Sequence, residues 1–359
     1  MKNPFGGTSL RTMYKIIIAV VIVGIITYYT TSSVKENDAL EGPTVAEPLP
    51  QELEIEYDAL ARPTTGVSTY IGQNVAQFTK QYGEPNRIDV SEVNDEWYVY
   101  NASYETFMLV GIETGKVAQI YVGGAAIDMA PFAIEQPLDE LYRSMIIQSE
   151  VSVPIENNMY SFTLSEQDLH QRLLIAYDEL YVQVYLSEEN GTVQGVRFLD
   201  AQTLVAQQPY EMIFMGELVT KQPPTSYQQV EIHAAQASQL SDLANVARTA
   251  EQLLPLVIEP ELNELASAHS DEMAYEGYLS SESPTNGDIK QQLEQATITY
   301  HKAGSNVALS YVDAIEAMHG WLNSPSHRDM LMQESFTHIG SGVFLNNYTQ
   351  IFIEQPQPQ

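Results

Sequence analysis

The chain has 359 residues, of which 47 are Asp or Glu, 16 are Lys or Arg and none is Cys, giving a formal net charge of −31. That length exceeds what one compact core usually organises and predicts two domains with connecting segments. So negative a charge repels phosphate backbones and argues against nucleic acid as a partner, and the absence of cysteine excludes disulfides, thiolate catalysis, cysteine-bound metals and a lipoprotein anchor.

The N-terminus has the pattern of an exported membrane anchor. Three basic residues precede an apolar run at residues 16–26: Lys2, Arg11 and Lys15. This order keeps the N-terminus in the cytoplasm and exports the downstream chain. The run is short for a span, and a cleaved signal peptide is the alternative, but residues 28–34 contain no small-x-small cleavage site. Residues 1–31 are therefore predicted to be an uncleaved single-pass anchor, with the C-terminal domains outside the cell.

The next two segments are predicted to be a stalk and a repeated domain. Residues 32–65 are acidic and contain several prolines, which favours an extended stalk. Residues 66–210 are predicted to hold two similar units, each a helix followed by an antiparallel meander. Strand-like runs occur at 96–100, 106–112 and 117–122 in the first unit and at 159–164, 173–177, 181–186 and 193–198 in the second. Nothing in these units has catalytic spacing.

Residues 211–239 are predicted to be a linker and residues 240–359 a second domain. Apolar residues and His269 share one helical face at spacings of three and four. A further helix at 312–322 must stop before Pro325, and Ser324 is expected to cap the next turn. A hairpin is expected near the C-terminus. The fold class is therefore α+β, with helices sandwiching a small sheet in this second domain.

Motifs in the second domain resemble those of a known family. In chain order they are Asn245-x-x-Arg248, Ala268-His-Ser-Asp-Glu-Met273, Gly277-Tyr-Leu-Ser, Trp321-Leu-Asn-Ser-Pro-Ser-His-Arg328 and Phe336-Thr-His-Ile-Gly-Ser-Gly342. This order is similar to that of bacterial CAP-superfamily domains, also called SCP-like extracellular domains. The repeated region resembles the N-terminal domain that accompanies them in spore-forming Gram-positive bacteria. The resemblance implies a CAP-type α/β sandwich at residues 240–359.

The resemblance also implies a cleft of two histidines and two further His or Glu residues, which hold a divalent cation in some relatives. The matching histidines are His327 and His338, which we expect to face each other. Serine replaces the family's other two groups, at Ser281 in place of His and at Ser305 in place of Glu. The candidate cleft residues are His327, His338, Ser281, Glu282, Ser305 and Asn306.

The number of side chains that could coordinate a cation then decides between a binding function and a catalytic one. Two imidazoles supply half of a cation shell, so at most a weak divalent-cation site is predicted unless Glu282, Glu316 or His319 completes it. A serine hydrolase is disfavoured because no nucleophile-elbow pattern surrounds either serine. The leading hypothesis is non-enzymatic binding or scaffolding of a small ligand, lipid or cell-wall component at the cell surface. The alternatives are a divalent-metal-dependent hydrolase acting on peptide or wall polymer, and a protein-binding domain in envelope assembly.

Overall fold

The computed structural model describes residues 59–356. The anchor predicted at residues 1–31 lies outside these residues, as does the predicted stalk up to residue 58. None of the described helices is long and apolar enough to span a bilayer. The structure therefore concerns the two domains predicted to follow the stalk.

A seven-stranded antiparallel sheet forms the centre of the first domain. Its strands are β1 (Arg87–Val90), β2 (Glu96–Tyr100), β3 (Met108–Glu113), β4 (Lys116–Val122), β7 (Arg172–Tyr177), β8 (Leu180–Leu186) and β9 (Val193–Leu199). They lie in the order β1-β2-β3-β4-β9-β8-β7. Strand β8 is buried at every position. Both faces of the sheet are therefore covered, which explains strands that are apolar almost throughout rather than alternating.

From the central β4–β9 pair, the sheet continues on one side through β3, β2 and β1, and on the other side through β8 and β7. The two predicted units therefore supply the two halves of one continuous sheet. Whether the units superpose stays a prediction.

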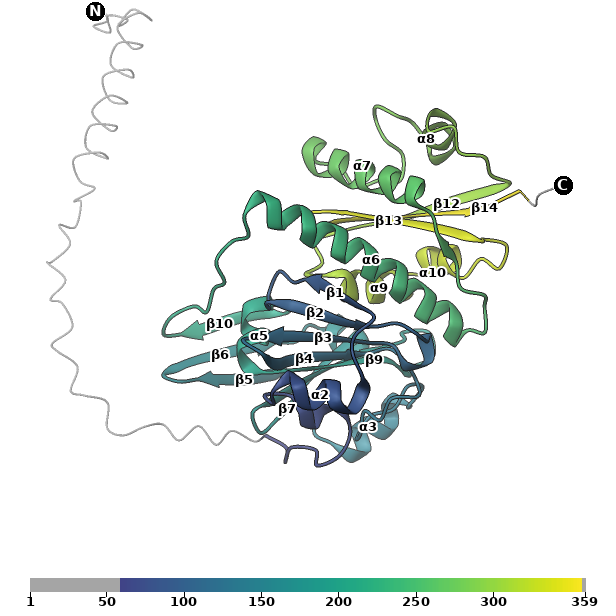
Figure 1. Cartoon of the computed structure of the whole chain (residues 1–359). Helices are drawn as coiled ribbons and strands as arrows, with labels where there is room; N and C mark the ends of the chain where they lie inside the picture. Colours follow the sequence, from purple (N-terminus) through teal and green to yellow (C-terminus); the bar gives the residue numbers. More distant parts are fainter. Residues whose placement is uncertain (1–58, 357–359) are drawn as a thin grey trace, which may run out of the picture. The chain divides into compact units, whose positions relative to one another are not determined.

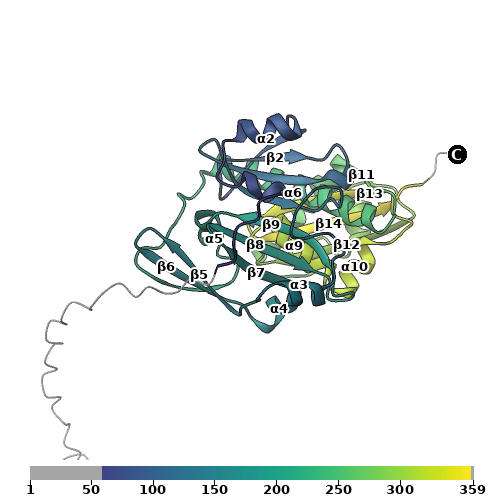
Figure 2. The same cartoon turned by 90° about the horizontal axis from the view of Figure 1, so that it is seen from below.

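One predicted strand of the second unit belongs to another sheet. Strand β6 (Asn158–Thr163) pairs with β5 (Glu150–Ile155) and with β10 (Glu211–Met215). The run at 159–164 was therefore wrongly assigned to the meander. Figure 1 shows β5, β6 and β10 extending together to one side of the seven-stranded sheet, and Figure 2 shows β5 and β6 there as well.

Short helices connect the strands of the first domain. They are the 3-10 helices η1 (Val67–Tyr70) and η2 (Tyr104–Thr106) and the α-helices α2 (Val75–Tyr82), α3 (Leu138–Ser144), α4 (Glu166–Gln171) and α5 (Ala201–Gln207). Helix α2 begins where the Asn74 side chain accepts a hydrogen bond from the Ala76 amide, and ends at Gly83, whose φ is 85°. Phe78 of α2 and Leu141 of α3 are buried in one core with the sheet.

Residues 211–239, predicted to be a linker, contain ordered structure. Besides β10, residues 211–239 include the first half of α6 (Ser226–Ala250). This helix begins after Pro224 with a capping box, in which Thr225 and Gln228 each bond the other's backbone amide. Helix α6 packs on β1 of the first domain and on β13 of the second. It is therefore a shared wall between the domains and not a spacer.

The second domain is the predicted sandwich of helices on a small sheet. Its sheet has the order β11-β13-β14-β12, where the strands are β11 (Val257–Ile258), β12 (Lys302–Leu309), β13 (His338–Phe344) and β14 (Asn347–Glu354). The expected C-terminal hairpin is confirmed as the antiparallel β13–β14 pair. Its helices are α7 (Pro260–Glu276), α8 (Ile289–Gln295), α9 (Ala314–Leu322) and α10 (Pro325–Leu331). Figure 1 shows α7 on one side of the sheet and α6, α9 and α10 on the other.

Two glycines of the last motif allow α7 to approach β13 closely. A Cβ at Gly340 would lie 2.2 Å from the Leu262 carbonyl carbon, and one at Gly342 would lie 2.1 Å from the Ser267 amide nitrogen. Neither position tolerates a side chain without moving the helix. The Gly-Ser-Gly segment is therefore explained by packing.

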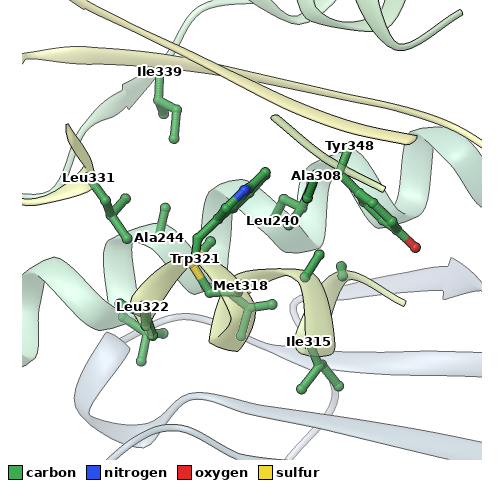
Figure 3. Packing of buried hydrophobic residues seen from close by; sticks show 14 of the residues in the cluster. Leu240, Ala244, Ala308, Ile315, Met318, Trp321, Leu322, Leu331, Ile339 and Tyr348 are labelled. Atoms are coloured by element: carbon green, nitrogen blue, oxygen red, sulfur yellow. The ribbon is translucent and has the colours of Figure 1, made fainter. Parts of the chain in front are cut away.

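Trp321 lies in the core, as we predict from its place at the end of an apolar helix face. Its side chain is 1% exposed, and its indole N–H donates to the Val307 carbonyl at 3.1 Å. Figure 3 shows it between the sheet residue Ile339 and Leu240 and Ala244 of α6. The same apolar cluster includes Tyr121 and Tyr185 of the first domain, so one core crosses the domain boundary.

Candidate functional site

Ser305 and His338 lie on the face of the small sheet that α7 covers. Ser305 pairs with Ile351 across β12–β14, and His338 pairs with Ile353 across β13–β14. Residues paired directly across two strands point to the same face. Both isoleucines pack with Leu262 of α7.

Asn306 and His327 lie on the opposite face of this sheet. Asn306 follows Ser305 in the strand, so it points the other way, and its amide donates to the His327 carbonyl at 2.9 Å. His327 lies in α10, with Nδ1 2.9 Å from the Ser324 hydroxyl. Ser324 was expected to cap α10, but its hydroxyl bonds this imidazole instead of a backbone amide. Pro325 does occupy the start of the helix, as predicted.

The two family histidines are therefore not brought together, and the expected facing pair is wrong. The sheet itself separates His327 from His338. Burial lowers the pKa of each imidazole below its ordinary value, which favours the neutral form. Among residues 59–356, no group of three or more His, Cys, Asp or Glu residues is placed to share a metal ion.

Ser281 and Glu282 are exposed in the loop between α7 and α8. The Ser281 carbonyl accepts a hydrogen bond from Gln292 at 3.3 Å, and the Glu282 amide donates to the Ser280 hydroxyl at 3.0 Å. Nearby, His269 is 4% exposed, with Nε2 2.8 Å from the Ser280 carbonyl. His269 thus ties this loop to α7, and it lines a pocket of about 160 Å³ with Glu272.

A polar stripe along α9 faces the first domain. Asp313, Glu316, His319 and Asn323 follow one another at spacings of three, three and four residues, which keeps them on one side of the helix. Asn323 shows the direction of this stripe: its amide donates to the Leu186 carbonyl, and its oxygen accepts from the Glu188 amide, both at 2.9 Å. The apolar residues of α9 point instead into the core around Trp321.

The two acids of the stripe form buried ion pairs with the seven-stranded sheet. Arg172 Nη1 lies 2.6 Å from Glu316 Oε1, and Arg197 Nη2 lies 2.8 Å from Asp313 Oδ2. Burial raises the pKa of Glu316, an effect that Arg172 opposes. Arg197 is wholly buried. Such pairs fix one relative position of two domains, because separating them would leave charges without partners.

His319 completes the stripe as a neutral imidazole. Its Nε2 lies 2.9 Å from the Tyr121 hydroxyl, and its ring stacks on Tyr185 with centroids 4.1 Å apart at an angle of 6°. Burial lowers the pKa of His319 to about 3. Glu316 and His319, considered above as donors for a cation, are therefore engaged by the first domain.

Cavities remain between the domains around this interface. One of about 390 Å³ lies between α6, α5 and the start of α9, and its wall includes Asp313 and Gln236. A second of about 300 Å³ borders Glu316 and Arg172. These volumes fall near the lower part of the range of small-ligand pockets, roughly 300–1,000 Å³. The sequence did signal the interface, through the three-and-four spacing of polar residues on α9, but not the strands it would meet.

Comparisons with known proteins agree with the resemblance seen in the sequence. The CAP-associated N-terminal family matches residues 71–210, and the cysteine-rich secretory protein (CAP) family matches residues 242–353. The "uncharacterized membrane protein YlbC" of Bacillus subtilis is 34% identical over 293 residues, which cover 82% of this chain and 85% of that protein. The "uncharacterized protein YkwD" of the same organism is 28% identical over 48% of this chain and 70% of its own length.

Two solved structures share the arrangement of both domains. An extracellular protein with an SCP domain from Bacillus anthracis has a TM-score of 0.77 at 30% identity, covering 87% of this chain and all of that one. A cysteine-rich secretory protein from Staphylococcus aureus has a TM-score of 0.72 at 26% identity, covering 83% of this chain and 98% of that one. Although it contains no cysteine, this chain belongs to the cysteine-rich secretory protein (CAP) family, because both of its domains are matched, and it carries the CAP-associated N-terminal domain before its CAP domain.

Proposed function

We propose that this protein is a non-enzymatic binding or scaffolding protein at the bacterial cell surface, anchored in the membrane through residues 1–31. Its ligand class is a small ligand, lipid or cell-wall component. The observation that carries the proposal is the engagement of Asp313, Glu316 and His319 in the domain interface. These acid and base groups position two domains, and His327 and His338 lie on opposite faces of a sheet.

Two further observations support the position at the membrane. Basic residues precede the apolar run at 16–26, which favours export of everything after it. The relative YlbC is described as a membrane protein. Protease treatment of intact cells should therefore digest the CAP domain together with a known surface protein. Survival of the CAP domain while that control is digested would contradict this topology.

The test of the function uses the full chain and purified cell walls. We expect the protein to sediment with the walls and to release no soluble fragments, with or without added zinc. The variants His327→Ala and Glu282→Ala should behave like the parent, because neither group belongs to a converging donor set. Release of wall fragments that stops in EDTA and in His327→Ala would instead support a metal-dependent hydrolase. If the protein did not sediment with the walls, the cell wall would be excluded as its ligand.

A further inference from the structure

Three aromatic rings from three elements form a continuous row on the CAP domain. Tyr275 of α7 lies against Phe344, the last residue of β13, with ring centroids 5.6 Å apart. Phe344 in turn lies against His233 of α6, with centroids 5.1 Å apart. The Tyr275 side chain is 76% exposed, and the other two rings are partly exposed. The row is therefore open to solvent where α7, β13 and α6 meet.

Exposed apolar side chains extend this row along α6 and around the turn after β13. Val230 lies three residues before His233 and is 67% exposed, and Tyr227, three residues further back, is 74% exposed. Leu345, which directly follows β13, is 52% exposed. Single exposed apolar residues are ordinary, but a contiguous group of them is typical of an interaction surface.

Acidic residues lie beside the row without a basic residue to balance them. Asp271 lies four residues before Tyr275 on the same side of α7, and Glu276 is the last residue of that helix. A helix carries a partial negative charge at its C-terminus, where a cation is favourable, yet the last turn of α7 contains no basic residue. Strands β13 and β14 contain no Lys or Arg, and Arg248 at the other end of α6 is bonded to the Leu331 carbonyl. We call the three rings and these two acids the aromatic–acidic surface.

His233 contributes a neutral ring to this surface and not a positive charge. The Leu345 N–H can only donate, and it donates to His233 Nε2 at 2.9 Å, so this nitrogen carries a lone pair. Burial lowers the pKa of His233, an effect that the nearby Asp271 opposes. The aromatic–acidic surface therefore presents ring faces and carboxylates, with no positive charge among them.

Ring faces and carboxylates attract the same kind of chemical group. The electron-rich face of an aromatic ring attracts a cation, and a carboxylate attracts it by charge. An acidic partner would be repelled. A small cation would leave Val230 and Leu345 uncovered, whereas a peptide segment can carry basic and apolar side chains together. The complementary partner is therefore a basic and partly apolar segment.

We propose that the aromatic–acidic surface docks a segment of another protein that carries Lys or Arg beside apolar side chains. The basic groups lie over the rings and next to Glu276, and the apolar side chains cover Val230 and Leu345. This inference goes beyond the proposed binding of a small ligand, lipid or wall component, and it does not rest on it. It also gives Glu276 a role that helix stability does not explain, because an acid is unfavourable at the C-terminus of a helix.

The experiment titrates the full chain, kept in a non-ionic detergent, with three peptides of equal length by calorimetry. The first peptide repeats Lys-Leu-Lys-Ser, the second replaces each Leu with Ser, and the third replaces each Lys with Glu. We expect the first peptide to bind most tightly, the second to bind more weakly and the third not to bind. Added salt should weaken the binding of the first peptide, because exposed charges are screened.

The test variants change the exposed Tyr275 and Glu276. Tyr275→Ala should weaken binding of the first peptide by about two- to fivefold, the loss expected for one exposed cation–π contact. The double variant Tyr275→Ala/Glu276→Gln should weaken it by about tenfold, because an exposed ion pair is lost as well. Thermal unfolding of the double variant should stay close to that of the parent, since both positions are exposed, and this separates lost binding from lost folding.

The control variant is Tyr142→Ala/Glu140→Gln, which makes the same two changes at exposed positions of α3 in the first domain. It should bind the first peptide like the parent, although it loses the same ring and the same charge. Equal losses in the two double variants would show that the net charge of −31 attracts the peptide without a specific surface, and would overturn the inference. No binding of the first peptide, or equally tight binding of the first and third peptides, would overturn it as well.

Discussion

The Tyr121 hydroxyl lies 2.9 Å from Nε2 of His319, which joins the central strand of the first domain to helix α9 of the CAP domain. Because burial lowers the pKa of His319 from its ordinary 6.5 to about 3, the folded protein keeps this imidazole neutral down to about pH 3. The unfolded chain takes up the proton near pH 6.5. The unfolded state therefore binds more protons between these values, and folding stability is lost as pH falls through this window.

The expected slope is about 1.4 kcal/mol of unfolding free energy per pH unit from this one residue. His319→Gln should flatten the slope by about that amount, because glutamine does not titrate and can still bond Tyr121. Denaturant unfolding at several pH values between 6.5 and 4 measures this. The same change at exposed His170 is the control. Equal slopes for His319→Gln and the parent would show that His319 is protonated in the folded protein.

Trp321→Ala should destabilise the protein by ~3–5 kcal/mol, the usual cost of removing a large buried aromatic side chain. The side chain fills the space between β13 and α6 (Figure 3), and its N–H is bonded to the Val307 carbonyl. Trp321→Phe should cost less, because it keeps most of the volume. If thermal unfolding of Trp321→Ala stayed within a degree or two of the parent, this burial would be wrong.

The local elements of the CAP domain were predictable because their signals are local. Pro325 marks the start of α10, and the alternating runs at 338–344 and 347–354 form the hairpin. The start of α6 was equally visible in the Thr225-x-x-Gln228 capping box, but the nearby prolines suggested a linker instead. The prolines, which are typical of a linker, were given more weight than the capping box that follows them directly.

The site was less predictable because it depends on which face of a strand each residue occupies. Ser305 and Asn306 are neighbours in the sequence, yet alternation sends them to opposite sides of the sheet. The family motifs identify the residues but not the face of the sheet that each residue occupies, so His327 and His338 were expected to meet. The amide contacts of Gln207 with Gln119 and of Gln236 with Glu92 join residues far apart in the sequence, and no local pattern reveals them.

Zinc should bind no more tightly to the parent than to His327→Ala. His327 and His338 lie on opposite faces of the sheet, so each offers a single imidazole, whereas a firm cation site needs three or four converging donors. Titration calorimetry at neutral pH measures the affinity, with His338→Ala as the matched variant. Submicromolar binding that disappears in His327→Ala would mean that other groups complete a shell around His327, and the hydrolase alternative would then lead.

The Arg172–Glu316 pair should behave as a coupled unit that crosses the domain boundary. Glu316 has a side chain only 3% exposed, and its Oε1 lies 2.6 Å from Arg172 Nη1. Arg172→Met would leave this carboxylate buried without its partner, and Glu316→Leu would leave the guanidinium likewise. Each single change should lower the unfolding free energy by about 3–5 kcal/mol, because a buried charge without a partner is costly.

The double variant Arg172→Met/Glu316→Leu should be more stable than either single variant, since well-packed apolar residues often replace a buried pair at little cost. Denaturant unfolding of the four proteins gives the coupling energy, which should be several-fold larger than for the exposed pair of Lys290 and Glu294, where a value of about 0–1 kcal/mol is expected. Because the two partners lie in different domains, both domains should unfold in one transition. Additive single effects, or two separate transitions, would show instead that the domains are held together mainly by the apolar core around Tyr121 and Trp321.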